Sequence, residues 1–126
     1  MAMTEEEKKI RKIFNKTKKN MQALSVWRDE FRPTVEAYAK LRFQYDVLFE
    51  KWQSDGCNVV EEYTNKSGAS NNRKTAEYQV LEVLRKDILT YENTLGLTPI
   101  GLKKIRQQEL NKKKKSSMSD KIRSLE

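Results

Sequence analysis

Apolar residues recur at alternating intervals of three and four in two separate stretches of the chain. These positions are Tyr38, Leu41, Tyr45, Leu48 and Trp52 in the first stretch, and Leu81, Leu84, Ile88, Tyr91 and Leu95 in the second. A mean period of about 3.5 residues keeps one stripe on one side of a helix, so each stretch predicts a helix that packs on a partner helix. Pro33 suits the first turn of a helix, and we expect the first helix over residues 33–54 and the second over residues 73–95.

The connection between these two helices is about 20 residues long, so we expect them to fold back antiparallel with their stripes facing each other. Asp55-Gly56 ends the first helix. Residues 57–63 (CNVVEEY) have strand character and residues 66–72 (KSGASNN) are typical of a turn. The pattern predicts a short hairpin or extended excursion, because no other segment is available to build a larger sheet.

The second helix ends in an explicit stop signal, Leu95-Gly96-Leu97-Thr98-Pro99. Gly96 can adopt the left-handed conformation after a helix, and Leu97 can fold back onto the last turn. Thr98 can cap the next helix, with Pro99 at its first position. The segment therefore predicts a corner from which a third helix starts. By spacing alone it would suit any helical protein.

The N-terminal segment predicts a basic helix. Thr4-Glu5-Glu6-Glu7 forms a capping box with acids in the first turn, and Ile10, Ile13, Phe14 and Met21 give a narrow apolar stripe. The candidate DNA-binding cations of this helix are Lys8, Lys9, Arg11, Lys12, Lys16, Lys18 and Lys19. Such a helix suits DNA phosphates, solvent or a membrane surface, and the short stripe favours the first two over the membrane.

The C-terminal segment is the most basic part of the chain. We expect the third helix to end near residue 113, and a tail over residues 119–126 to add one or two helical turns. Its candidate DNA-binding cations are Lys103, Lys104, Arg106, Lys112, Lys113, Lys114 and Lys115. Four adjacent lysines repel one another, so we expect this run to be mobile. A mobile basic arm gains phosphate contacts that depend steeply on salt and do not read sequence.

The charge is unevenly distributed over the 126 residues. Residues 1–23 carry a net charge of +4, residues 24–95 carry −2, and residues 96–126 carry +6. We therefore divide the chain into a basic N-terminal helix or arm (1–30), a helical core and oligomerisation domain (31–110), and a basic flexible C-terminal tail (111–126). Basic tails can serve solubility alone, but two basic ends together favour nucleic acid.

Composition narrows the class further. Apolar residues make up 37% of the chain and charged residues 35%. A core this thin is usually completed by packing against another subunit, and Phe43, Val47 and Phe49 widen the apolar surface of the first long helix beyond one stripe. We expect a soluble intracellular protein, because the chain has no segment apolar enough to span a membrane and no signal-peptide pattern.

Catalytic and metal-binding patterns are missing from the sequence. The chain has no histidine, and its single Cys57 has no visible partner as a ligand or nucleophile. Gly96 and Gly101 have the spacing of a phosphate-binding loop, but Leu102 stands where that loop requires lysine. The remaining carboxylates of the middle region are scattered over a helix and a loop and suit a solvated face. We therefore expect a protein without enzymatic activity, cofactor or metal.

The region from Phe31 to Leu110 resembles the small terminase subunits of tailed phages. The resemblance lies in an aromatic-rich helix (Tyr38 to Trp52), an extended excursion, and a second helix that ends in Leu-Gly-Leu-Thr-Pro before a basic segment. Two features depart from that family. Asn71-Asn72 is not followed by the proline that often introduces the second helix, and Ile100-Gly101-Leu102-Lys103 replaces a small or polar residue and an arginine.

The resemblance implies a non-catalytic packaging protein. A small terminase subunit forms a ring-like homo-oligomer, recognises double-stranded viral DNA in the host cytoplasm, and regulates the large subunit, which carries the ATPase and nuclease. The expected fold is mainly α, an antiparallel helical hairpin with a short excursion and extra helices at both ends, in an oligomer. A helical scaffold protein and a small transcription regulator remain as alternatives, since residues 4–31 could contain a helix-turn-helix.

Overall fold

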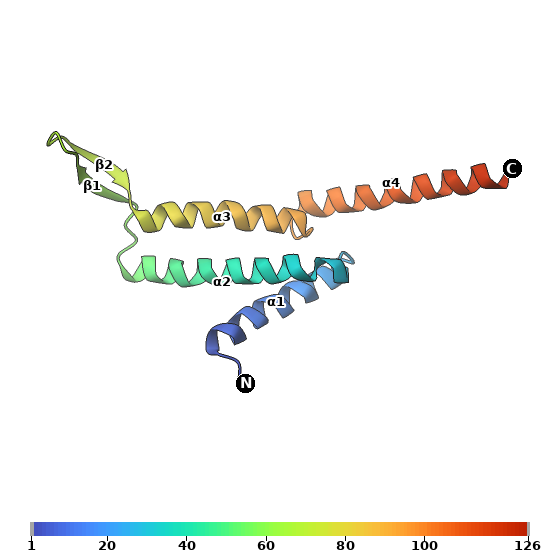
Figure 1. The fold of residues 1–126 in the computed structure, drawn as a ribbon, viewed down its shortest axis with the longest axis horizontal. Coiled ribbons are helices and arrows are strands. Elements are labelled where there is room, and N and C mark those ends of the chain that lie inside the picture. The colour runs from blue at the N-terminus through green and yellow to red at the C-terminus, as the bar shows by residue number, and fades with distance from the viewer. Residues whose placement is uncertain (1, 126) are drawn as a thin grey trace.

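A computed structural model describes residues 2–125 and shows a mainly helical chain, as expected (Figure 1). The elements are α1 (Glu5–Ala23), the 3-10 turn η1 (Asp29–Phe31), α2 (Arg32–Ser54), β1 (Val60–Thr64), β2 (Ser70–Lys74), α3 (Ala76–Thr94) and α4 (Pro99–Ser124). Helices α2 and α3 form the predicted antiparallel hairpin. The predicted mainly helical fold, with a short hairpin and extra helices at both ends, is confirmed.

The arrangement places α2 between two helices (Figure 1). Helix α3 packs along one side of α2, and α1 crosses its other side. The β-hairpin extends beyond one end of the α2–α3 pair, and α4 leaves the other end and continues away from the bundle. The two ends of the helical pair therefore carry different elements, a two-stranded hairpin at one end and a long helix at the other.

The two predicted apolar stripes meet inside one chain. Tyr38, Leu81, Ile88 and Leu95 are buried, and the other six stripe positions are half-buried between α2 and α3. The aromatic rings contact each other across the pair, with centroid separations of 6.4 Å for Tyr38–Tyr91 and 6.0 Å for Trp52–Tyr78. These residues form an intramolecular core, to which α1 adds its own apolar side chains.

Three helices end in the same way. A residue of positive φ follows the helix, and its N–H and that of the next residue donate to carbonyls of the last helical turn. After α3, Gly96 (φ 75°) donates to the Asn93 carbonyl and Leu97 donates to the Glu92 carbonyl, the pair of bonds of a Schellman motif. Helix α2 ends likewise at Gly56. Helix α1 ends in this way at Ser25 (φ 60°). Because serine stands there in place of the glycine that usually marks such an end, the sequence shows only an irregular pattern at this position.

The third helix is longer than predicted. Helix α4 continues to Ser124 and includes the lysine run, so the expected end near residue 113 is wrong. Residues 102–126 contain neither glycine nor proline, and lysine is a good helix former. Successive residues of a helix point about 100° apart, so four adjacent lysines project in different directions instead of along one face.

The hairpin also differs in its bounds. Strand β1 pairs antiparallel with β2 from Val60↔Lys74 to Thr64↔Ser70, so part of the expected turn and the expected start of α3 belong to β2. A cross-strand pair supplies the reason, since Arg73 donates to the Glu61 carboxylate (2.9 Å). Helix α3 begins only after Thr75, whose hydroxyl accepts from the Tyr78 N–H.

Candidate nucleic-acid interface

The capping box of α1 forms in full. The Thr4 hydroxyl accepts from the Glu7 N–H (3.1 Å), and the Glu7 carboxylate accepts from the Thr4 N–H (3.2 Å). Phe14, Thr17 and Met21 are buried. Because these three positions lie on one side of α1, they fix which of its cations face solvent.

Four of the predicted cations form a row on the outer side of α1. Lys9, Lys12, Lys16 and Lys19 are spaced by three, four and three residues, and all four are exposed. Positions at these intervals share one helix face. Within residues 2–125 none of the four takes part in an ion pair closer than 4.0 Å. We call this row the α1 lysine stripe.

The other three cations of α1 have partners within the chain. The Lys8 ammonium lies 3.4 Å from the Glu5 carboxylate. The Arg11 guanidinium lies 5.8 Å from the centre of the Phe14 ring, and the Lys18 ammonium lies 5.0 Å from that of Trp27. The ion pair of Lys8 and the aromatic contacts of Arg11 and Lys18 make these three less available to phosphates than the stripe.

The start of α4 is held closely against α3 and the α1–α2 connection. The Thr98 hydroxyl accepts from the Gly101 N–H (3.0 Å) and donates to the Asn93 side chain (2.5 Å). Leu102 and Ile105 pack against the core. The Glu109 carboxylate then pairs with Arg28 at 2.8 Å. These contacts set the direction of α4.

Beyond Glu109 the helix makes no such contacts. Residues 110–125 are all exposed, and the helix continues away from the bundle (Figure 1). All the candidate cations of α4 are exposed, and two further ones, Lys121 and Arg123, were not singled out from the sequence. No cation of α4 forms an ion pair within the described part of the chain.

The two basic sets lie on separate parts of the molecule. The α1 lysine stripe follows a helix packed on α2, whereas the cations of residues 112–123 lie on the projecting part of α4 (Figure 1). One copy of the chain therefore offers two separate basic surfaces. An arrangement of this kind can contact a polyanion at two places.

A groove of about 710 Å³ between α1 and the α2–α3 pair has mixed charge. Lys16 and Arg42 line it, but so do Asp46 and Glu92, and Arg42 lies 3.8 Å from Glu92. Burial, and next to it the nearby Glu92 carboxylate, raise the pKa of Tyr38 to about 12. The groove therefore has no surplus of cations that would favour an anionic ligand.

Neither a metal centre nor a membrane-spanning helix is found among residues 2–125. No group of three cysteine, aspartate or glutamate side chains is placed to hold a metal ion there. In the same part of the chain, no helix combines the length and apolar character needed to cross a membrane.

Comparison with known proteins bears on the identity of this fold. A family model described as phage terminase, small subunit, matches residues 11–112, which include most of α1, the whole helical hairpin with its β-excursion, and the anchored half of α4. The searches of curated proteins and of solved structures returned no match. The family match covers well over half of the chain, including the corner at Leu95 to Pro99. The chain belongs to the phage terminase small subunit family.

Proposed function

We propose that this chain is the DNA-recognition and regulatory component of a phage genome-packaging motor. It acts in the host cytoplasm as a homo-oligomer, with a large subunit that carries the ATPase and nuclease. Membership of the terminase small subunit family supports a role in packaging. The protein itself does no chemistry in this proposal. Its task is to hold double-stranded viral DNA and to control the subunit that cuts and moves it.

The observation that carries the DNA contact is the exposed, unpaired charge of α4. Residues 111–125 contain six cations and one acid, and none of these cations has a carboxylate partner within 4.0 Å among the described residues. A phosphate contact would therefore replace no internal ion pair. Each cation that neutralises a phosphate releases counterions, which supplies affinity without reading sequence.

The α1 lysine stripe supports a second contact. Lys9 to Lys19 extends over about 15 Å of helix, and duplex DNA carries about one charge per 1.7 Å of its axis. A straight row of lysines on a helix anchored to α2 can follow one strand of phosphates. We propose that the stripe positions the duplex, while α4 adds further contacts.

The proposed division of the chain follows from the distribution of charged residues along it. We propose residues 1–30 as the basic arm, residues 31–110 as the subunit core and oligomerisation domain, and residues 111–126 as the basic tail. The ten residues of the two apolar stripes serve the subunit core. Contacts between subunits must then use other apolar side chains, such as Val47, which is 50% exposed.

DNA affinity across a salt series tests the tail. We expect K112Q/K113Q/K114Q/K115Q to reduce the slope of log K against log salt by about 3 to 4, since each lost phosphate contact removes about 0.9. The matched control is K51Q/K66Q/K74Q/K86Q, which removes the same charge from the core and should change the slope by less than about 1.

The same measurement separates the competing outcomes. An unchanged slope for the tail variant, with a reduced slope for K9Q/K12Q/K16Q/K19Q, would assign the DNA contact to α1 alone. Absence of DNA binding by the wild-type protein at about 50 mM salt would contradict the proposal and favour a helical scaffold. Light-scattering mass tests the homo-oligomer, which a monomer at micromolar concentration would contradict.

A further inference from the structure

The projecting part of α4 carries an apolar stripe that has no packing partner among residues 2–125. Met118, Ile122 and Leu125 are 64%, 60% and 87% exposed. Their spacing of four and three places them on one face, and we call them the distal stripe. Lys114, Lys115 and Lys121 lie three or four positions from Met118, so they flank this face.

A helix segment of this kind gains little from solvent alone. Residues 111–125 make about four turns, and isolated helices of this length are marginal in water even in favourable sequences. Most of the stability of such helices comes from packing an apolar face against another element. The distal stripe is the face that this segment has available for packing.

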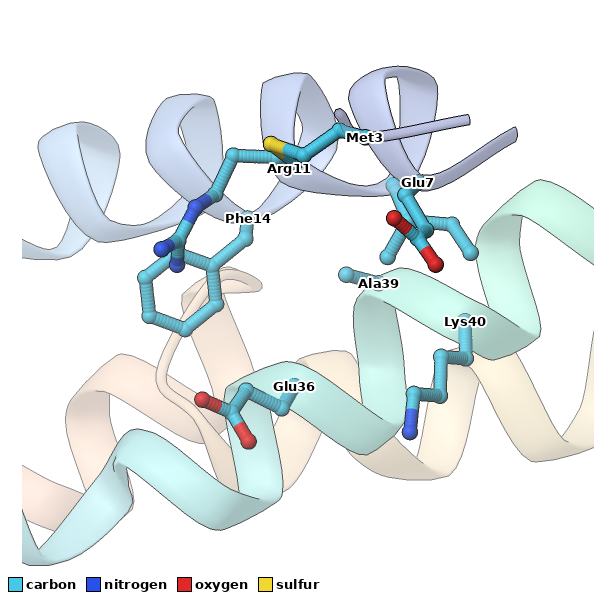
Figure 2. A pocket seen from close by; sticks show the side chains of 8 residues that line it. Met3, Glu7, Arg11, Phe14, Glu36, Ala39 and Lys40 are labelled. Atoms are coloured by element: carbon cyan, nitrogen blue, oxygen red, sulfur yellow. The ribbon is translucent and has the colours of Figure 1, made fainter. Parts of the chain in front are cut away.

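The same chain has an open apolar groove between α1 and α2, on the side of α2 that faces away from α3. It has a volume of about 260 Å³ and lies between the N-terminal half of α1 and the start of α2. Met3, Phe14 and Ala39 lie around it in Figure 2, with Ile10 from the same helix as Phe14. Along α2 the apolar surface continues through Phe43 and Val47, and Val47 is 50% exposed.

Charged residues border this surface. Glu36, Lys40 and Glu50 share the face of α2 that carries Phe43 and Val47, because they follow one another at intervals of three, four or seven residues. Glu36 and Glu50 have no ion-pair partner within the described residues.

The α1 side of the groove adds Glu7 and Arg11 (Figure 2). The Arg11 guanidinium is folded over the Phe14 ring. The border therefore holds three carboxylates and two cations. The tail is different, since residues 111–125 have six cations and one acid.

We infer that the distal stripe of one copy docks on this surface of a second copy, so that neighbouring subunits join head to tail. Apolar side chains meet apolar side chains, and Lys121 of the tail meets Glu36 or Glu50, whereas Lys112 to Lys115 stay available to phosphates. Residues 36–50 span about 21 Å of helix and residues 114–125 about 17 Å, so the acceptor face is long enough for the distal stripe and its flanking lysines. A contact between two different surfaces generates a ring when its rotation closes.

Two other occupants fit less well. The chain's own α4 leaves the bundle at the end where α2 starts and continues away from it, so as a straight helix it cannot fold back onto the groove (Figure 1). Pairing of two α4 tails would bring together two segments that each have five more cations than acids, and like charges repel. The inference rests on the proposed homo-oligomer and names the surfaces that make it.

Light-scattering mass of designed variants tests this interface. M118Q/I122Q removes the apolar stripe without changing charge, and E36K/V47K alters the acceptor at two exposed positions. We expect each variant to associate at least about tenfold more weakly than wild type, since each buried apolar side chain contributes more than that factor. The controls are I100Q on α4 and V83K/D87K on α3, which change similar exposed residues outside both surfaces and should keep the wild-type mass.

Mixing the two variants gives the sharper result. Each retains the surface that the other lacks, so a 1:1 mixture should form a pair of twice the 14.9 kDa chain mass. A mixture that stays at the mass of one chain would overturn the inference, as would M118Q/I122Q with the wild-type mass. A monomeric wild type would overturn the homo-oligomer itself, whereas an oligomeric wild type with unaffected variants would overturn only this interface.

Discussion

At the scale of the residue, Gly101 shows how a single position sets the direction of a helix. It lies buried in the first turn of α4, and a Cβ placed there would meet the Asn93 carbonyl oxygen at 2.2 Å and its carbon at 2.8 Å. The neighbouring Thr98 hydroxyl caps this turn while it donates to Asn93. The first turn of α4 therefore approaches the end of α3 more closely than any residue with a side chain allows.

Substitution of Gly101 tests this close approach. Ala usually stabilises a helix by about 1 kcal/mol relative to Gly, but overpacking costs about 1–3 kcal/mol, and here the obstacle is backbone. We expect Gly101→Ala to lower the free energy of unfolding by about 2 kcal/mol, measured by urea denaturation. Ser116→Ala, at an exposed site of α4, should change it by no more than about 0.5 kcal/mol. A stabilised Gly101→Ala protein would contradict the close approach.

The sequence predicts the structural role of only one of the two glycines at this corner. Gly96 stands between Leu95 and Leu97 just before Thr98-Pro99, and that order predicts a helix stop from local hydrogen bonds alone. Gly101 showed only a spacing that resembles a phosphate loop. Its role depends on Asn93, which approaches it only after the chain has turned, so no local pattern identifies it.

At the scale of the element, the β-hairpin is separate from the core. Every residue of β1 and β2 is exposed. Its base is tied to α2, since the Trp52 indole N–H and the Thr75 hydroxyl both donate to the Asn58 carbonyl. A lone two-stranded hairpin is marginal in water, so its contribution to the stability of the helical pair should be small.

Removing the hairpin tests this independence. The Thr75 N–H donates to the Val59 carbonyl (2.9 Å), so residues 60–74 can be replaced by Asn-Gly without moving the helices. We expect the free energy of unfolding to change by less than about 1 kcal/mol, because shortening a loop changes closure entropy only slightly. Leu81→Ala, in the core, should cost about 2–5 kcal/mol by the same denaturation assay. Loss of cooperative unfolding in the hairpin-less chain would refute the prediction.

At the scale of the whole molecule, a packed part and a projecting part are joined by one helix. The first part ends near Glu109, where the ion pair with Arg28 holds α4 against the α1–α2 connection. The second part is fully exposed and carries most of the cations of α4. A chain of this shape can change its polyanion contacts or its neighbours without changing its core.

Truncation after Leu110 tests whether the packed and projecting parts are independent. We expect residues 1–110 to keep a thermal midpoint within about 3 °C of the M118Q/I122Q variant, which lacks the same inferred subunit contact, because residues 111–125 bury no core side chain. DNA affinity at about 100 mM salt should fall at least tenfold, because the truncated chain loses six cations. Calorimetry and a binding titration measure the two quantities. A large fall in the midpoint would show that the tail stabilises the core.

Local chemistry determined much of this protein. The apolar stripes, the capping box at Thr4 and the stop at Gly96 each depend on residues within a few positions of one another, so the sequence alone predicted the helical pair, its excursion and the family. The tertiary structure decided which cations are free, that the stripes are used within one chain, and where α4 points. Those properties depend on contacts between distant residues, such as Arg28 with Glu109, which are 81 positions apart and meet only after folding.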